Sequence, residues 1–418
     1  MNDRPTIALA VTRGFDDYAL IDSGHGRKLE RFGAITVDRP EEQAMWAPRL
    51  SADAWARADA AFVGDQEAES ENGRWRFRDK QPASWPMRIK GITATCRFSN
   101  FRHVGVFPEQ LPLWEWMLDA LPRGGAEPPR LLNLFAYTGV ASLLAAAAGA
   151  HVTHVDASKR AIDWAKENQA ASGLGNAPIR WMLDDARKFA AREVRRGRTY
   201  HGILVDPPKF GRGPDKELWE IFAHLPELMR TLAQLLDPTH AFLVLTVYAI
   251  RASSLSIDAL AESLQRPERL CGLHFFNPVP SSALVEIVRG TLTDHDLVAA
   301  ARDWVSSLGK AAIVVRDSPG FASSRLGLAL GLEAIRMVEE DVASPADIDE
   351  AMVLGYRHPM GPLRLTDLVG LDVRLGIAEH LHRELGERFA PPELLRRMVA
   401  EGRLGRKTGR GFYEWSEE

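Results

Sequence analysis

The sequence predicts an α/β protein: a doubly wound parallel sheet with a β-rich N-terminal extension and an all-α C-terminal domain. An apolar run over 131–135 ends in a small-residue turn, opens an Ala-rich helix and returns as a second strand that ends at Asp156. This is the pattern of a first βαβ unit in a nucleotide-binding sheet. Strand-like and helix-like segments then alternate to about residue 247, which favours a parallel sheet.

Residues 1–100 are expected to form the β-rich extension, because short β-like runs alternate there with polar turns and acidic loops. Trp46, Trp75 and Trp85 could present an aromatic surface to an unstacked RNA base, although core burial is the commoner role of such residues. The expected strands are 18–22, 34–37, 75–78 and 92–97.

The sheet domain is expected over 101–252. Ser158 can cap the helix that follows it, and Gly149 can end the helix before the second strand. The expected order is strand 131–135, helix 140–148, strand 151–156, helix 158–171, strand 178–183, helix 185–196, strand 201–206, helix 215–235 and strand 241–247.

The loop after the first strand indicates a nucleoside ligand. It leads into a helix N-terminus, where backbone amides point outward. Asp156 follows the second strand and is placed to accept hydrogen bonds from ribose hydroxyls. The turn lacks G-x-G-x-x-G, since Gly139 is its only glycine, so it favours adenosine with a small cationic tail over a dinucleotide.

Four segments in order resemble motifs I to IV of class I S-adenosylmethionine (SAM) methyltransferases, and most of all the rRNA methyltransferases related to the large-subunit cytosine-C5 enzymes. These segments are Asn133–Gly139, Val155–Ser158, Asp184–Ala186 and Asp206–Phe210. The resemblance implies SAM as cofactor and RNA, in particular rRNA, as substrate. It is specific because four motifs stand in register.

The resemblance also implies a set of site residues. Asp184 or Asp185 is placed for the adenine amino group, Asp206 for the acceptor base, and a G-x-F-P-E-Q stretch brings Phe107 and Gln110 over the cofactor. The implied cofactor residues are Asn133, Phe135, Tyr137, Thr138, Gly139, Asp156, Ser158, Asp184, Asp185 and Gln110, and the implied catalytic residues are Asp206, Pro207, Pro208 and Lys209.

One departure bears on the acceptor atom. Cytosine-C5 methylation needs a cysteine thiolate, which such enzymes carry after the fifth strand. The corresponding stretch here, 245–249, has no cysteine. This argues against a C5-methylcytosine product and leaves attack by a base nitrogen open.

Composition sets further expectations. The net charge of −4 gives no global case for nucleic acid, so an RNA surface has to be a local basic patch. Cys96 and Cys271 cannot make a disulfide framework or a zinc site by themselves. No signal-peptide pattern or membrane-length apolar run is present, and we expect a cytoplasmic protein without membrane contact.

From about residue 253 the chain resembles 3-hydroxyacyl-CoA dehydrogenases instead. The resemblance implies that His274 takes the proton of the substrate hydroxyl and that Glu286 orients the histidine. It also implies that Ser253 and Asn277 complete the site. The segments that carry it are 266–280, 284–288, 317–321, 358–362 and 407–413. The chain therefore looks like a chimera or fusion, and acyl-CoA becomes a second candidate ligand.

Two departures weaken this second resemblance. Ser324 stands where the family has an asparagine, and no G-x-G-x-x-G follows an expected strand, so we expect NAD to be unlikely as a cofactor. Residues 253–317 are expected to complete the methyltransferase sheet with a strand pair. The alternative function is a 3-hydroxyacyl-CoA dehydrogenase module of fatty acid β-oxidation that lacks its own NAD-binding half.

Residues 318–418 are expected to form an all-α domain. Amphipathic segments separated by Gly and Pro predict its helices, and the dehydrogenase resemblance implies that this domain makes a homodimer. The expected helices are 325–340, 345–354, 362–385 and 391–400. Since the SAM motifs are complete and the dinucleotide loop is absent, the sequence favours a SAM-dependent rRNA methyltransferase.

Overall fold

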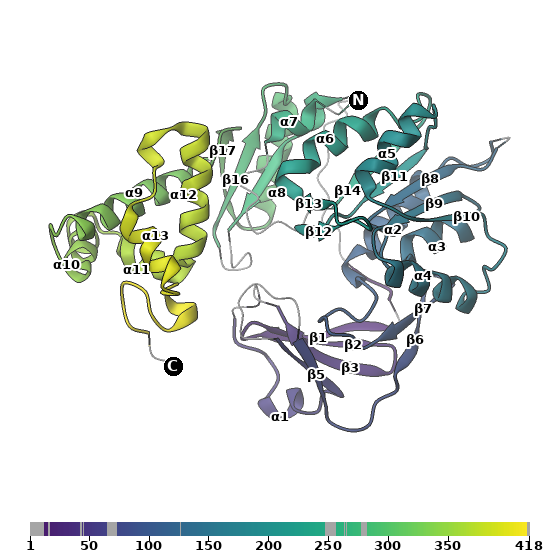
Figure 1. Ribbon diagram of the computed structural model, residues 1–418, viewed down its shortest axis with the longest axis horizontal. Helices are drawn as coiled ribbons and strands as arrows, with labels where there is room; N and C mark the ends of the chain where they lie inside the picture. The colour runs from purple at the N-terminus through teal and green to yellow at the C-terminus, as the bar shows by residue number, and fades with distance from the viewer. Residues whose placement is uncertain are drawn as a thin grey trace. The chain divides into compact units, whose positions relative to one another are not determined.

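The computed structural model describes residues 12–15, 17–41, 44, 46–64, 73–125, 127–246, 256–262, 264, 266–276 and 282–415. Contacts divide the chain into an N-terminal unit within Thr6–Ile250 and a C-terminal unit within Arg251–Phe275 and Ala283–Glu418 (Figure 1). The predicted fold class, α/β with a β-rich N-terminal part and a helical C-terminal region, is confirmed. Among the described helices, none has the length and apolar character to cross a membrane.

The N-terminal extension is β-rich, as predicted, and holds one sheet in the order β1-β2-β3-β4-β5 and a separate hairpin, β6–β7. Trp75 and Trp85 are buried in its core, whereas Trp46 is partly exposed. Three strands were not predicted, and one of them, β2, carries four charged residues in six. The elements are β1 (Tyr18–Gly24), β2 (Arg27–Phe32), β3 (Ile35–Pro40), α1 (Ala52–Trp55), β4 (Ala60–Gly64), β5 (Gly73–Phe77), β6 (Ser84–Ile89) and β7 (Ile92–Arg97).

The centre of the N-terminal unit is a five-stranded parallel sheet in the order β10-β9-β8-β11-β14 (Figure 1). Helix α3 contacts α2 and α4, and α5 contacts α6, as in the two helical layers of a doubly wound sheet. The strands are β8 (Arg130–Leu134), β9 (His151–Asp156), β10 (Ile179–Leu183), β11 (Gly202–Val205) and β14 (Phe242–Leu245). The helices are α2 (Leu111–Ala120), α3 (Val140–Ala147), α4 (Lys159–Ala171), α5 (Ala186–Arg195) and α6 (Ile221–Ala233).

The strand order places the ligand edge. Chain order reverses between β8 and β11, because β9 and β10 lie on one side of β8 while β11 and β14 lie on the other. Loops diverge at such a switch point and leave a crevice beyond the carboxyl ends of the strands. The sheet therefore brings the segments after β8 and β11 together, although about 70 residues separate them in sequence.

The expected helix 215–235 begins later than predicted, at Ile221. The preceding residues form a hairpin of β12 (Phe210–Arg212) and β13 (Leu218–Glu220). Its turn carries Gly213, Pro214 and Lys216, and Lys216 has a φ of 69°. The left-handed backbone at Lys216 is incompatible with a continuous helix, so the hairpin replaces the first turns.

The C-terminal unit has its own three-stranded sheet in the order β15-β16-β17. The expectation that residues 253–317 complete the parallel sheet of the N-terminal unit is therefore wrong for the described residues. Strand β16 pairs antiparallel with β15 on one side and parallel with β17 on the other. The strands are β15 (Gly272–Phe275), β16 (Leu284–Arg289) and β17 (Ala311–Arg316), accompanied by α7 (Ile257–Ala261) and α8 (His295–Ser307).

The rest of the C-terminal unit is helical around a core that includes Leu328, Leu332, Leu363, Leu371 and Leu381. The expected helix 362–385 is split in two by Gly370, whose φ of 97° breaks the helical path. The helices are α9 (Ser323–Glu339), α10 (Pro345–Glu350), α11 (Pro362–Val369), α12 (Leu371–Leu385) and α13 (Glu393–Ala400). The predicted ranges of the four domains stay predictions.

Candidate functional site

A cavity lies beyond the carboxyl ends of β8, β11 and β14, at the switch point of the parallel sheet. Aromatic and aliphatic side chains form most of its wall, and Asp206 is the only charged residue of the lining. The lining consists of Gly105, Phe107, Gln110, Leu113, Trp114, Asn133, Phe135, Ala136, Tyr137, Thr138, Val140, Ala141, Leu204, Val205, Asp206, Val244 and Thr246. Seven of the predicted site residues, with Phe107 counted among them, meet here. The others are not part of this lining: Gly139, Asp156, Ser158, Asp184, Asp185, Pro207, Pro208 and Lys209.

The loop after β8 is tightly wound. Phe135, Tyr137 and Gly139 have φ angles of 56°, 47° and 81°. Such angles are costly for non-glycine residues, and they concentrate at ligand sites. A Cβ at Gly139 would lie 2.9 Å from the Cβ of Ala165, so glycine is required where α3 approaches α4. The loop thus presents the N-terminus of α3 beside the cavity.

Asp156 fastens this loop. Its Oδ2 accepts from the Tyr137 backbone N–H at 2.8 Å, and its Oδ1 accepts from the Ser158 N–H at 2.8 Å. Burial raises the pKa of Asp156, against the lowering effect of these two hydrogen bonds. Ser158 itself caps α4, because its Oγ accepts from the Ala161 N–H. Each carboxylate oxygen keeps a further lone pair for a ligand hydroxyl.

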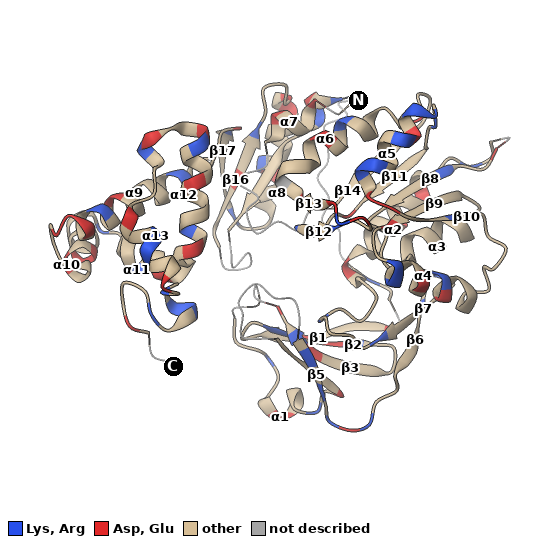
Figure 2. Ribbon diagram, viewed as in Figure 1, with Lys and Arg blue, Asp and Glu red and all other residues tan. Residues whose placement is uncertain are grey.

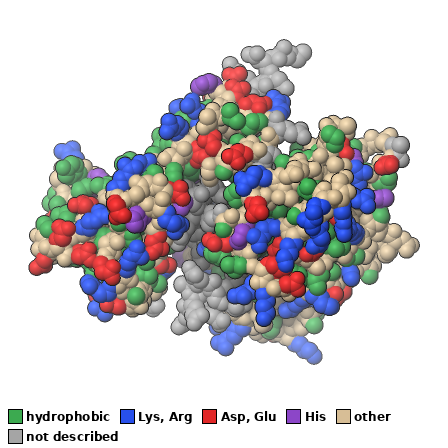
Figure 3. Space-filling model, turned by 45° about the horizontal axis from the view of Figure 1, so that its top comes forward, with side chains coloured by type: hydrophobic (Ala, Val, Ile, Leu, Met, Phe, Trp, Pro, Cys, Tyr) green, Lys and Arg blue, Asp and Glu red, His purple; other side chains and the backbone are tan. Residues whose placement is uncertain are grey.

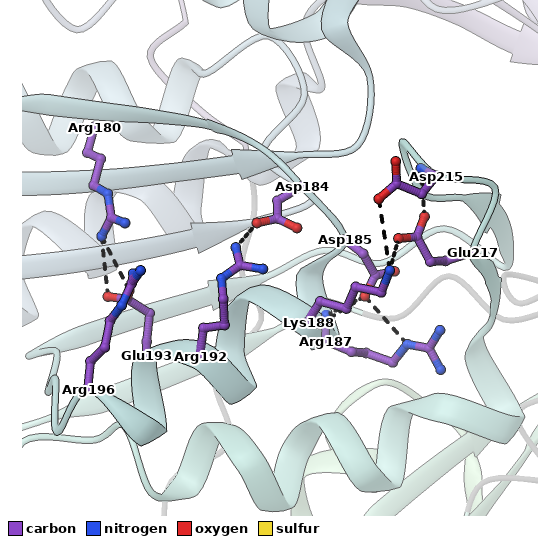
Figure 4. Close-up of polar contacts among 10 residues, drawn as sticks. All are labelled: Arg180, Asp184, Asp185, Arg187, Lys188, Arg192, Glu193, Arg196, Asp215 and Glu217. Carbon is purple, nitrogen blue, oxygen red and sulfur yellow. Dashed lines mark hydrogen bonds and ion pairs between the residues drawn. The ribbon is translucent and has the colours of Figure 1, made fainter.

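The two acids after β10 have different partners (Figure 4). Asp185 is 5% exposed and caps α5, its Oδ1 accepting from the N–H groups of Arg187 and Lys188 at 3.0 Å. Asp184 makes an ion pair with Arg192 on the same helix. An adenine amino group at this edge would therefore share Asp184 with Arg192.

Asn133 and Thr138 support the loop from behind. The Asn133 amide donates to Ser142 Oγ at 3.0 Å, and the Thr138 hydroxyl donates to the Gly105 carbonyl at 2.6 Å. Both residues are at most 5% exposed. Their polar atoms are satisfied inside the protein, so they shape the cavity wall more than they offer it hydrogen bonds.

Asp206 is held from two sides at the end of β11. The Gln110 amide donates to its Oδ2 at 2.5 Å, and the Thr246 hydroxyl donates to its Oδ1. Burial raises the pKa of Asp206, while these hydrogen bonds oppose the rise. Gln110 precedes α2 and Thr246 follows β14, so three separate segments fix one carboxylate.

The residues after Asp206 leave the sheet in a defined path. Pro207 is buried, and the carbonyl of Pro208 accepts from the indole N–H of Trp219 at 2.7 Å. The ammonium of Lys209 lies 5.1 Å from the ring centroid of Phe210. Trp219 also packs its ring against Phe135, with 4.9 Å between centroids. One indole thus connects the loop after β8 with the loop after β11.

Two residues of this arrangement were missed by sequence reasoning. Thr246 directly follows β14, and its position at a strand end was the available signal. Trp219 had no signal, because a lone Trp inside an expected helix is ordinarily core. Phe107, which was predicted, lies 5.5 Å from Tyr137 between ring centroids and covers the loop.

The C-terminal unit holds a separate polar pair. His274 on β15 and Glu286 on β16 are register partners, and His274 Nδ1 lies 2.7 Å from Glu286 Oε2. Glu286 is fully buried, and its Oε1 accepts from the N–H groups of Ala322 and Ser323 and from the Ser323 hydroxyl. Burial acts to raise the pKa of Glu286, but the hydrogen bonds from His274 and Ser323 outweigh it and lower that pKa.

This pair has the geometry of a general base with its orienting carboxylate. Ser323 beside the predicted Ser324 was not anticipated, and it fixes Glu286 from the first turn of α9. The predicted Ser253 and Asn277 lie outside the described residues.

The N-terminal part is similar to a SAM-dependent methyltransferase from Agrobacterium tumefaciens. Its crystal structure is 51% identical, covers 61% of this chain and 79% of that chain, and gives a TM-score of 0.56. This finding confirms the first resemblance drawn from the sequence. The similarity shows neither an acceptor atom nor an RNA substrate.

The C-terminal part matches the family model of the 3-hydroxyacyl-CoA dehydrogenase C-terminal domain over residues 320–415. It is 44% identical over 200 residues to a probable 3-hydroxybutyryl-CoA dehydrogenase of Bacillus subtilis, covering 48% of this chain and 68% of that protein. A 3-hydroxybutyryl-CoA dehydrogenase of Mycobacterium tuberculosis is 44% identical over 198 residues, 47% of this chain and 65% of that protein. The chain therefore spans about two thirds of the length of these curated relatives.

One expectation is corrected by these comparisons. The family model of the 3-hydroxyacyl-CoA dehydrogenase NAD binding domain matches residues 227–318. The prediction that NAD is unlikely as a cofactor is therefore wrong. The match holds although no G-x-G-x-x-G follows an expected strand of the sequence. Two unrelated families in one chain are consistent with a fusion.

Proposed function

We propose that the N-terminal unit methylates RNA, because the N-terminal part of the chain belongs to the SAM-dependent methyltransferases. The C-terminal part belongs to the 3-hydroxyacyl-CoA dehydrogenases. The proposed substrate is rRNA, and the proposed acceptor is a nitrogen of a base. The carrying observation is Asp206, a buried carboxylate that Gln110 and Thr246 orient in the switch-point cavity.

The cavity fits a sulfonium cofactor. Asp206 is its only charged side chain, and Phe107, Phe135 and Tyr137 contribute aromatic faces to its wall. Aromatic faces attract cations, and a lone carboxylate favours a positively charged ligand. Asp156 and the loop 135–139 would hold the ribose and the adjoining part of the nucleoside. Bound SAM supplies an electrophilic methyl group.

In this proposal the protein contributes position and hydrogen bonding. Asp206 accepts a hydrogen bond from the amine or ring N–H of the acceptor base and directs its nitrogen toward the methyl group. Gln110 and Thr246 keep the carboxylate in place, and the apolar wall excludes water from the site. Pro207 and Pro208 restrict the backbone beside the base.

The cysteines support a nitrogen acceptor over carbon 5 of cytosine. Cys96 is fully buried in the N-terminal extension, and burial raises the pKa of its thiol to about 12. A thiol of that pKa stays protonated and is a poor nucleophile. Cys271, the other cysteine of the sequence, belongs to the C-terminal unit.

The test is methyl transfer from radiolabelled SAM to purified rRNA by the full chain, with label mapped to the nucleoside. We expect label on a base nitrogen, and its loss in Asp206→Asn while S-adenosylhomocysteine still binds. The matched control is Asp237→Asn, an acid near the amino-terminal edge of the same sheet. Label on cytosine carbon 5, or equal labelling by Asp206→Asn, would contradict the proposal.

A second candidate activity rests on the His274–Glu286 pair. We propose that this pair removes the hydroxyl proton of a 3-hydroxyacyl-CoA while NAD oxidises the substrate, as one step in the β-oxidation of fatty acids. NAD supplies the hydride acceptor, as the matched NAD binding domain model suggests. The supporting geometry is the 2.7 Å contact between His274 Nδ1 and Glu286 Oε2, by which the buried carboxylate orients the imidazole. Oxidation of NADH with acetoacetyl-CoA by the full chain should vanish in His274→Asn; no turnover by the unaltered chain would reject this activity.

We also propose a homodimer through the helical region. Apolar residues on α9 and α11 are exposed: Leu326, Leu330, Leu365, Leu368 and Val369. A cluster of this kind is unusual on a monomer surface and favours a second copy of the chain. Sedimentation should give a dimer for the unaltered chain and a monomer for Leu326→Glu; a monomer in both would exclude this interface.

A further inference from the structure

We propose that the hairpin β12–β13 is a contact surface for single-stranded RNA, next to the acceptor site. The inference rests on the proposed RNA methylation and names the element that holds the strand beside the target base. The hairpin begins four residues after Asp206 and includes Phe210, Arg212 and Leu218. It therefore lies where a nucleotide adjoining the target has to pass.

Phe210 provides a stacking surface. Its side chain is 56% exposed, although it is a large apolar group in strand β12. Unpaired bases stack on such rings, whereas bases inside a duplex are covered by their neighbours. Lys209 lies 5.1 Å from the same ring and can contact phosphate without leaving it. The pair therefore offers one base and one phosphate contact side by side.

Arg212 adds a second cation at the end of β12. It is exposed, and no ion-pair partner is found for it among the described residues. The two acids in the turn of the hairpin do not neutralise it, since Glu217 and Asp215 both lie within 4.0 Å of Lys188 on α5. A free guanidinium beside an exposed aromatic ring is typical of surfaces that track a nucleic acid backbone.

Helix α5 is a weaker candidate, although it is rich in basic residues (Figure 2). Figure 3 shows Lys and Arg side chains gathered on the N-terminal unit with acidic side chains among them. Figure 4 shows why α5 offers less charge than its composition suggests: Arg187, Lys188 and Arg192 pair with Asp185, Glu217 and Asp184, respectively. Paired charges release few phosphate counterions, so the helix contributes less than its composition suggests.

The hairpin is fixed in place from beneath. Trp219 is buried and donates to the Pro208 carbonyl, Lys188 pairs with Glu217, and the Arg187 guanidinium donates to the Leu218 carbonyl at 3.0 Å. These contacts tie β13 to the loop after β11 and to α5. A surface held this way loses little conformational freedom on binding, which favours affinity.

The test is fluorescence anisotropy with a labelled single-stranded RNA of about 16 nucleotides and mixed sequence. We expect Phe210→Ala to weaken binding by about 5- to 100-fold, and Phe210→Leu to weaken it too, because stacking needs the ring. Arg212→Gln should lower the slope of log affinity against log salt by about 0.7. The control is Trp116→Ala on α2, which removes a comparably exposed aromatic residue at the opposite edge of the sheet and should leave affinity unchanged.

Binding of S-adenosylhomocysteine separates this inference from the proposed function. All four variants should bind it like the unaltered chain. If the unaltered chain methylates RNA while Phe210→Ala binds the probe equally well, the hairpin inference alone is overturned. Equal affinity for a duplex of the same sequence would overturn it as well. If the unaltered chain binds S-adenosylhomocysteine but no RNA, both the inference and the RNA substrate are rejected.

Discussion

The two units differ in how they assemble a site. In the N-terminal unit, residues at the carboxyl ends of all five parallel strands lie along one edge, because parallel strands end on the same side of their sheet. In the C-terminal unit, His274 and Glu286 meet because they are register partners on adjacent antiparallel strands. The first arrangement joins distant motifs into one cavity, whereas the second brings together only near neighbours. The comparison predicts that substitutions in the two units act on separate ligands.

The largest effect is expected for Asp206→Asn. The variant removes the charge that orients the acceptor but keeps the shape of the side chain. Loss of one preorganised polar group typically lowers turnover by about 100- to 1,000-fold. Single-turnover methyl transfer to rRNA measures this, and NADH-linked activity should not change. A decrease in both activities would mean that the two units do not act separately.

A smaller effect is expected for Asp156→Ala on cofactor binding. The variant removes the acceptor for ribose and the two hydrogen bonds that hold the loop at Tyr137 and Ser158. Charge-assisted hydrogen bonds contribute about 1.5–3 kcal/mol, so affinity for S-adenosylhomocysteine should fall by about 10- to 100-fold. Calorimetry measures the change, and unchanged affinity would remove Asp156 from the site.

Stability of the C-terminal unit sharpens the comparison further. Glu286→Gln replaces a buried carboxylate that accepts from His274, Ala322 and Ser323, and we expect a loss of about 1–3 kcal/mol. Because the folded pKa of Glu286 is lowered, its ionised form stabilises the unaltered unit above the unfolded pKa near 4.5, and this contribution is lost as pH falls through the folded pKa. Thermal scans from pH 7 to acid should show this loss in the unaltered chain and not in the variant. Binding of S-adenosylhomocysteine by the N-terminal unit should be unaffected in this variant. A loss of that binding would contradict the claim that the two units act separately.

The smallest effect concerns the pH profile of methyl transfer. Gln110→Ala removes a hydrogen bond that lowers the pKa of Asp206, so that pKa should rise further. Since the ionised carboxylate is the working form, the acid limb of the rate profile should move to higher pH. An unmoved limb would show that Asp206 does not govern it.

Much of the N-terminal fold follows from the sequence, because its strands are apolar runs separated by clear helix signals. The motif residues could be placed at strand ends, and the strand order then brings the loops after β8 and β11 together. The partners of the two acids after β10 could not be predicted from the sequence: Asp185 caps α5, and Asp184 pairs with Arg192. Such pairings depend on side-chain positions that periodicity does not encode.

Two other features escaped prediction for identifiable reasons. The stretch 210–220 carries charged and apolar residues at spacings that also suit a helix, so its hairpin became visible only through the turn at Lys216 and the buried Trp219. The separate sheet β15-β16-β17 depends on β17, a strand that was not predicted and that pairs parallel with β16. Tertiary pairing decided both cases.

The central claim is that the N-terminal unit holds a SAM site built around Asp156 and the switch-point cavity. Calorimetric titration of the full chain with S-adenosylhomocysteine tests it most directly. The account predicts saturable binding at one site per chain, with the heat strongly reduced in Asp156→Ala. Absence of binding by the unaltered, folded chain would contradict it.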